Sequence, residues 1–315
     1  MKKKIVFHLS TALFFSLVAT LAKAQTVDDA VMMSKKQWCN GLTYMHSSWR
    51  EYWEGTSKRE NKNLGVVYTQ SVMLMSNYGV SDKLNVIVTV PYVWTHASAG
   101  TLHGLKGFQD IDLDLKYEFF SKKIGKGTLS LIAVGSFSTP LTNYENDFMP
   151  MSIGLGSTNL TGRLTVDYQS GIFFATLSSA YSWRSDVTID RTSYYTDEIH
   201  YTNKVDMPNQ LNSNLLFGIR KTNLTVQAVV MNMYTFGGFD IRKNDMPFVS
   251  NQMNMTSLGG HVKYFIPFVP NLELIGGADF VIDVPQLRIS GRNMGQSSTY
   301  TAGLYYVLSM KKSKK

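Results

Sequence analysis

The chain has 315 residues, of which 44% are hydrophobic and only 17% are charged, whereas an ordinary soluble domain carries about 25% charged residues. Its formal net charge of +8 arises at the two ends, because four lysines lie in residues 1–24 and four more in residues 311–315. The part between them is close to neutral, which excludes an extended basic surface for nucleic acid. The single cysteine, Cys39, excludes an internal disulfide and a cysteine-based metal cluster.

The first 24 residues have the three parts of a secretory signal peptide. Lysines at positions 2–4 precede an apolar stretch at 5–21, and Ala22-Lys23-Ala24 matches the A-x-A cleavage pattern. We therefore predict cleavage before Gln25, with an uncleaved N-terminal helix as the alternative. Beyond this segment there is no run of 18 apolar residues, so the mature chain has no predicted membrane-spanning helix.

The rest of the chain alternates apolar and polar residues, as strands with one lipid-facing side do. In residues 111–119 every odd position is apolar and every even position is charged. The pattern is weaker in 64–78 and 223–236, where both faces are fairly apolar. Turn signals divide the chain into twelve predicted strands, which in order are 41–54, 64–78, 84–97, 108–120, 128–140, 155–168, 172–185, 209–220, 223–236, 255–266, 271–283 and 297–309.

Short and long connections alternate between these strands. The short ones lie at 79–83, 121–127, 169–171, 221–222 and 267–270, and the long ones at 55–63, 98–107, 141–154, 186–208, 237–254 and 284–296. Only helices and closed barrels satisfy every backbone polar group in lipid, and this alternation is typical of bacterial barrels. We therefore predict an all-β fold, a transmembrane antiparallel up-and-down β-barrel of about 12 strands formed by residues 25–315 in a Gram-negative outer membrane. Two soluble β-sandwich domains are the competing interpretation.

Two neighbouring segments carry a family resemblance. Residues 78–92, YGVSDKLNVIVTVPY, and residues 107–117, GFQDIDLDLKY, resemble the MetA-pathway phenol-degradation family of outer-membrane transporters, which is loosely related to fatty-acid-channel-like β-barrels. The resemblance is good over residues 64–120 and otherwise concerns architecture. It implies an outer-membrane location and passage of small, often hydrophobic or aromatic compounds, and it assigns no ligand-binding residue.

Two features of the sequence need a structural explanation. Pro91 lies inside a predicted strand, where proline marks a bulge or an edge; a structural bulge is the favoured interpretation, and a side path through the wall is the alternative. Many outer-membrane barrels end on an aromatic residue, but here five residues, four of them lysine, follow Met310. The chain departs from that pattern.

Charged residues on the predicted strands are the candidate site. An Arg or Lys facing mid-bilayer lipid costs about 2–4 kcal/mol, so we expect these side chains to face the lumen. They are Asp110, Asp112, Asp114, Lys116, Glu118, Arg163, Asp167, Arg184, Arg220, His261, Lys263, Glu273, Asp279 and Asp283. They could form a selectivity lining or a salt-bridged filling of the lumen, and both interpretations stay open. Loops 186–208 and 237–254 could fold inward as a constriction, although solvated loops are favoured.

The sequence gives little sign of catalysis. His46-Ser47-Ser48 is the one string that suggests a barrel phospholipase, and it lacks the His-x-Ser-Asn-Gly arrangement of such an enzyme. We expect no enzyme activity, no catalytic residue, no metal and no cofactor. The predicted function is a channel or transporter for diffusion of small, hydrophobic or aromatic molecules, and a non-conducting structural or adhesive barrel is the alternative. Expected partners are the lipid bilayer with lipopolysaccharide, the outer-membrane assembly machinery and a small-molecule substrate, but not nucleic acid.

Overall fold

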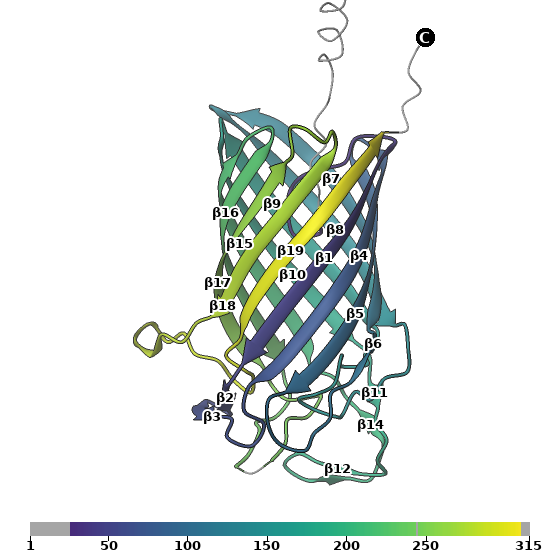
Figure 1. Ribbon diagram of the computed structural model, residues 1–315, viewed down its shortest axis with the longest axis vertical. Coiled ribbons are helices and arrows are strands. Elements are labelled where there is room, and N and C mark those ends of the chain that lie inside the picture. The colour runs from purple at the N-terminus through teal and green to yellow at the C-terminus, as the bar shows by residue number, and fades with distance from the viewer. Residues whose placement is uncertain (1–25, 244, 310–315) are drawn as a thin grey trace, which may run out of the picture.

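Twelve long antiparallel strands form a closed ring in the computed structural model (Figure 1), which describes residues 26–243 and 245–309. The predicted signal peptide and the lysines after Met310 lie outside these residues. Around the ring the strands are β1 (Gln37–Trp49), β4 (Val67–Ser81), β5 (Leu84–Ala97), β7 (Asp110–Ile124), β8 (Gly127–Pro140), β9 (Asn159–Ser170), β10 (Phe173–Arg184), β15 (Asn209–Arg220), β16 (Leu224–Phe236), β17 (Asn254–Phe265), β18 (Leu272–Val281) and β19 (Ser298–Ser309).

The ring closes between its first and last strands. β1 pairs with β19 from Gln37 opposite Ser309 to Ser48 opposite Ser298, so no long edge is left unpaired. The short turns lie at one end of the ring with the start of β1 and the end of β19, and the long loops lie at the other (Figure 1). In outer-membrane barrels the short turns are periplasmic and the long loops extracellular. We call the two ends the turn end and the loop end.

The outer wall is apolar and the inner wall is largely polar. Outward side chains such as Leu164 and Phe173 are 63% and 65% exposed, and a lipid environment would cover them. Inward positions include the buried polar residues Asn77, Thr176 and Thr235. Because successive side chains of a strand point to opposite faces, the apolar outer wall and the polar inner wall follow from the period-two alternation in the sequence. The predicted transmembrane barrel is confirmed.

The ladder beside Pro91 shifts by one residue, because two residues of β5, 90–91, face three residues of the neighbouring chain segment, 109–111. The β5–β7 ladder runs to Thr89 opposite Asp112, and beyond it the short strand β6 (Lys106–Phe108) continues the pairing with β5. Between them the Gln109 N–H donates to the Pro91 carbonyl at 3.0 Å. A bulge is therefore present at this position, as the favoured interpretation expected, but it lies on the strand opposite Pro91.

The predicted first strand, 41–54, has the wrong bounds. β1 begins at Gln37 and ends at Trp49, and the chain then forms a separate hairpin of β2 (Glu51–Glu54) and β3 (Ser57–Glu60). Gly55 turns this hairpin with φ +58°, a conformation that glycine adopts without strain. Residues 50–54 contain no turn residue before Gly55, which is why the prediction extended the first strand to Glu54.

Smaller elements complete the loop end. These are β11 (Val187–Thr188), β12 (Tyr194–Tyr195), β13 (Ile199–His200), β14 (Lys204–Val205) and the single-turn helix η1 (Pro285–Leu287). Within the described residues, no helix is long and apolar enough to cross a membrane.

Candidate functional site

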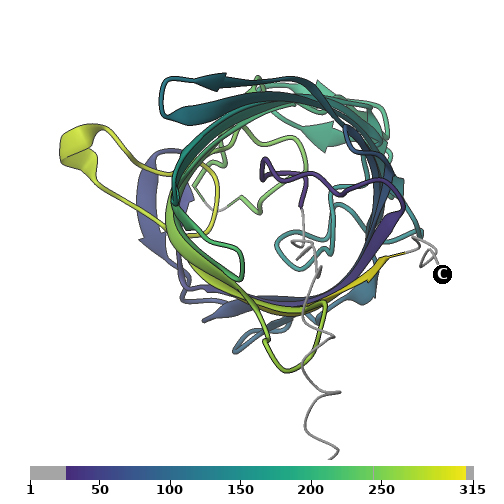
Figure 2. The ribbon, with the colours of Figure 1, turned by 90° about the horizontal axis from the view of Figure 1, so that it is seen from above.

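The segment before the first strand lies inside the barrel. Residues 26–36, which we call the N-terminal plug, appear within the ring in the view along its axis (Figure 2). Met33 of the plug is fully buried and packs with Met75 of β4, Ile87 of β5 and Tyr305 of β19. Burying a methionine of this size against apolar side chains stabilises by about 1.5–3 kcal/mol. This contact fixes the plug near the turn end of the lumen.

Asp29 of the plug is bound from two opposite walls. Its carboxylate oxygens lie 3.0 Å from the ammonium of Lys116 on β7 and 2.8 Å from that of Lys263 on β17. These strands stand six positions apart in the ring of twelve, so they face each other. Lys116 also donates to the carbonyls of Thr26, Asp29 and Val31 at 2.7, 2.6 and 3.0 Å. Lys116 thus binds the backbone of the plug as well as the Asp29 carboxylate.

The Asp29 carboxylate is held in its ionised form. Burial alone would raise its pKa, but the ammonium groups of Lys116 and Lys263 outweigh burial and hold the pKa of Asp29 well below its usual range. A buried carboxylate is tolerable only when it is paired and hydrogen-bonded. Both conditions are met, so the plug is fixed at neutral pH.

Asp28 ties the plug to two more strands. Its carboxylate lies 2.5 Å from the Arg163 guanidinium on β9 and accepts a hydrogen bond from the Asn214 amide on β15 at 3.2 Å. Two adjacent acidic residues therefore contact four strands of the ring. The sequence placed Lys116, Arg163 and Lys263 among the lumen candidates, and the structure brings them together around the plug.

The acidic row of β7 runs from the plug toward the loop end. Asp112 and Asp114 lie on the inner face between Lys116 and Asp110, and Asp114 is buried. At the loop end the Tyr144 hydroxyl donates to the Asp110 carboxylate at 2.5 Å. Burial, together with this hydrogen bond, raises the pKa of the Tyr144 phenol.

The loop that carries Tyr144 folds over the inner wall, which the sequence analysis did not anticipate. In residues 141–158, Met151 is fully buried beside Leu64 and Val67, and its carbonyl accepts a hydrogen bond from the Thr95 hydroxyl at 2.6 Å. The available signal was the run of apolar residues at 148–155, FMPMSIGL, because a fully solvated loop is usually polar. This loop narrows the mouth from within.

Two other candidates form a separate ion pair near the turn end. The Arg220 guanidinium lies 3.2 Å from the Asp167 carboxylate and also donates to Gln169 at 3.0 Å, and both charged side chains are buried. Thr176 donates a short hydrogen bond to Asp167. The Arg220 guanidinium also stacks 3.9 Å from the ring of Phe174, so this pair fills and stiffens the wall.

The remaining candidates are spread along the lumen and the mouth. His261 on β17 contacts Asp279 on β18 at 2.9 Å, and Glu273 is buried at the turn end of β18. Arg184 contacts Gln210 at the loop end. Glu118 lies on β7 one inward position beyond Lys116, toward the turn end. Asp283 lies past the end of β18 and contacts Lys58 of the β2–β3 hairpin at 3.6 Å, so it belongs to the loops rather than to the lumen.

Loops 186–208 and 237–254 pack against each other. Val187, Val205 and Met207 are buried together with Val249 of the second loop. The loops therefore form a cap with its own small core, and the second loop also lines a cavity together with Pro150 of residues 141–158. His46, the candidate of the phospholipase interpretation, contacts the Gln70 amide at 3.1 Å.

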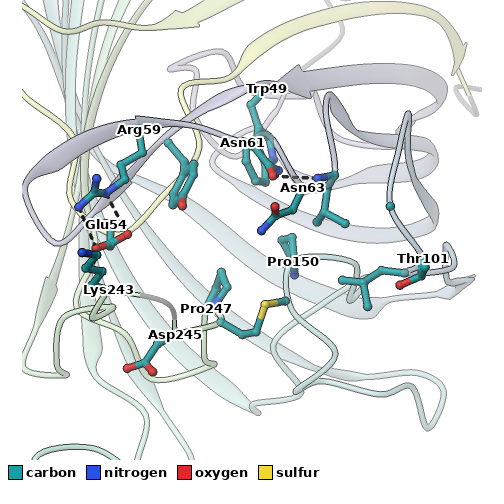
Figure 3. Close-up of a pocket in the computed structure, with 15 residues that line it drawn as sticks. Trp49, Glu54, Arg59, Asn61, Asn63, Thr101, Pro150, Lys243, Asp245 and Pro247 are labelled. Carbon is teal, nitrogen blue, oxygen red and sulfur yellow. Dashed lines mark hydrogen bonds and ion pairs between the residues drawn. The ribbon is translucent and has the colours of Figure 1, made fainter.

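Two of the cavities among the described residues concern the plug and the loops. One of about 320 Å³ lies beside the plug and is lined in part by Asp29, His261 and Lys263. The other, about 600 Å³, lies among the loops and is lined in part by Trp49 and Tyr52 (Figure 3). We call them the lumen cavity and the mouth cavity. Both fall within or near the usual size range of small-molecule sites, about 300–1,000 Å³.

Comparison with known proteins identifies the fold. No family model matches the chain, and no curated protein matches it. Among solved structures, the COG4313 outer membrane channel from Pseudomonas putida F1 aligns with a TM-score of 0.65 and 14% identity, covering 88% of this chain and 97% of that chain. This chain has the fold of an outer-membrane β-barrel. The NanC porin (TM-score 0.45, 8% identity, 84% and 98% covered) and the CymD monoaromatic hydrocarbon channel (0.41, 11%, 88% and 89%) are less similar.

Proposed function

We propose that this barrel is a channel through which small, hydrophobic or aromatic molecules diffuse across the outer membrane. In this proposal residues 1–24 direct export and are removed, and the outer-membrane assembly machinery inserts residues 25–315. The resemblance of residues 78–92 and 107–117 to the MetA-pathway phenol-degradation family points to the same class of substrate. The proposal includes no covalent chemistry and no cofactor.

The observation that carries the proposal is the apolar half of the lumen cavity. Met73, Leu216, Val229, Met231 and Ile275 are inward residues of four strands, and all line this cavity. A water-filled pore normally has a polar interior, whereas a small-molecule site is mostly apolar with a few polar groups. The two segments with the weakest alternation, 64–78 and 223–236, supply three of these five side chains. In this proposal their apolar inner faces form the apolar wall of the lumen cavity.

The charged lumen residues have different roles in this proposal. Lys116, Arg163 and Lys263 hold the plug, and the Asp167–Arg220 pair stiffens the wall. The side chains nearer the mouth form the selectivity lining, and they are Asp110, Asp112, Asp114 and Arg184. These three acids and one base carry a net negative formal charge, which would disfavour the passage of anions through this part of the lumen.

The test is entry of an aromatic probe into intact cells. N-phenylnaphthylamine is kept out by an intact outer membrane and fluoresces once it enters lipid. Cells that produce the barrel should take it up several-fold faster than cells that produce an equal amount of an unrelated barrel of similar size. Equal rates, with the protein correctly inserted, would remove the proposed function.

The plug gives one alternative a physical basis. A lumen occupied by residues 26–36 could also belong to a non-conducting structural or adhesive barrel. Releasing the plug with the double substitution Asp28→Asn and Asp29→Asn separates the two functions. If the barrel is a channel, the variant should pass more ions in planar bilayers and more probe in cells than the native protein. If it is a structural barrel, the variant would also gain ion flux, but the native protein would admit no probe.

A further inference from the structure

We propose that the mouth cavity is a capture site for one uncharged aromatic small molecule. The proposal deepens the proposed function and rests on it, because it assigns the first place at which the transported molecule binds. The cavity lies among four loops at the loop end (Figure 3), between the β2–β3 hairpin, residues 98–105, residues 141–158 and residues 237–253.

The walls of the cavity suit an aromatic ring. Trp49 and Tyr52 both line the cavity, with their ring centroids 6.1 Å apart and their planes tilted by 58°. Aromatic rings prefer such offset or edge-to-face partners over parallel sandwiches. Leu102 and Pro247 add aliphatic surface, and Met246 adds a thioether, which makes favourable contacts with aromatic rings.

The charges of the cavity favour an uncharged ligand. Its lining contains two bases, Arg59 and Lys243, and two acids, Glu54 and Asp245, so their formal charges cancel. The Arg59 guanidinium is also paired with Glu54 at 3.0 Å. An anionic ligand would have to give up its hydration without gaining a net opposite charge, and that exchange is unfavourable.

A few polar groups are placed to orient a ligand without binding an ion. Asn61, Asn63 and Thr101 line the same cavity. The side-chain oxygen of Asn61, Oδ1, accepts a hydrogen bond from the Leu64 N–H at 3.1 Å (Figure 3). A mostly apolar cavity with a small number of amide and hydroxyl groups is the usual composition of a small-molecule site. It fits a ring that carries a hydroxyl or carbonyl group.

The walls of the cavity are tied together by side-chain hydrogen bonds, so the cavity is a formed site. Asn293 accepts hydrogen bonds from the N–H groups of Gly55 and Ile241 at 2.8 and 2.9 Å, and donates to the Gln252 carbonyl at 2.6 Å. These bonds join the β2–β3 hairpin, loop 237–254 and loop 284–296. Binding to a formed site avoids the entropy cost of ordering loops.

The experiment measures binding of 4-fluorobenzyl alcohol by ¹⁹F NMR to the full mature barrel in lipid nanodiscs. Empty nanodiscs give the linear partitioning of the probe into lipid, which is subtracted. Wild-type protein should show saturable binding. Leu102→Trp fills the cavity and Met246→Asp places a carboxylate in it, and each should weaken binding about tenfold or more. Leu287→Trp is the matched control, because Leu287 is 69% exposed on η1 and does not line the cavity.

The outcomes separate the site from the function. Saturable binding that survives both Leu102→Trp and Met246→Asp within about twofold, in protein that keeps its heat-modifiable migration on gels, would overturn the site. Binding of 4-fluorobenzoate as tight as that of the alcohol would overturn the preference for an uncharged ligand. Loss of binding in both cavity variants but not in Leu287→Trp supports the site, even if N-phenylnaphthylamine entry shows that the proposed function is wrong.

Discussion

The ammonium group of Lys116 lies 3.0 Å from the carboxylate of Asp29, 87 residues earlier in the chain. Through this contact the N-terminal plug, which precedes the first strand, is held inside the lumen. Lys263 reaches the other oxygen of the same carboxylate from the facing wall. The plug is therefore held across the lumen of the barrel by one acidic residue between two bases, and several measurable consequences follow from this arrangement.

Replacing Asp29 with Asn should loosen the plug. The substitution removes the carboxylate that both buried ammonium groups contact, and breaking a buried ion pair in this way costs about 3–5 kcal/mol. Single-channel recordings in planar bilayers should show larger or more frequent openings than the wild type. Asp190→Asn removes an exposed acid from the loop end and should leave the recordings unchanged. Identical traces for Asp29→Asn and the wild type would mean that the apolar contact of Met33 and the contacts of Asp28 suffice to hold the plug.

Mild acid should not release the plug. The pKa of Asp29 is held below its ordinary value of 3.8 by the two lysines, so its stabilising effect is complete above that value and is lost only as the pH falls through the still lower value of the folded protein. Conductance should therefore stay constant between about pH 8 and pH 4.5. An opening transition centred near pH 6 would show that a group other than Asp29 controls the plug.

Much of the barrel could be predicted from the sequence because lipid acts on every second residue. The charged and apolar faces of residues 111–119 could be assigned from alternation alone, and β7 places them as expected. The partners of those charges could not be assigned, since an ion pair between residues 29 and 116 leaves no periodic trace. The one available sign was two adjacent acids, Asp28 and Asp29, directly ahead of a barrel whose lumen candidates included bases.

The loops were predicted least well, for a related physical reason. Their structure depends on side-chain bonds between distant segments, such as the bidentate contact of Arg292 with Asp240 at 2.8 Å. That hydrogen bonding lowers the pKa of Asp240 and raises that of Arg292. No spacing rule relates residues 240 and 292, so loop lengths could be predicted but not which loop enters the lumen.

Asn293→Gly should loosen the cap of loops without affecting the barrel. Asn293 has φ +51°, which glycine adopts freely, so the substitution removes the side-chain bonds and adds no backbone strain. Loss of a buried hydrogen-bond partner costs about 1–3 kcal/mol, and limited proteolysis should cut the extracellular loops faster. Asn271→Gly is the control, because Asn271 also has a positive φ, at 67°, but lies in a turn at the other end. Equal cleavage rates for the two variants would contradict the role of Asn293.

Val229→Thr should reduce transport of apolar molecules while it leaves the fold intact. Both side chains are β-branched and suit a strand, but the hydroxyl replaces a methyl on the apolar half of the lumen cavity. A loss of about 1 kcal/mol of apolar contact corresponds to roughly fivefold weaker binding, so N-phenylnaphthylamine entry at low probe concentration should slow by up to that factor. Val226→Thr makes the same change on the outward face of β16 and should not slow entry. If the two variants behave alike, the probe does not pass the lumen cavity, and the apolar inner face of β16 serves packing instead.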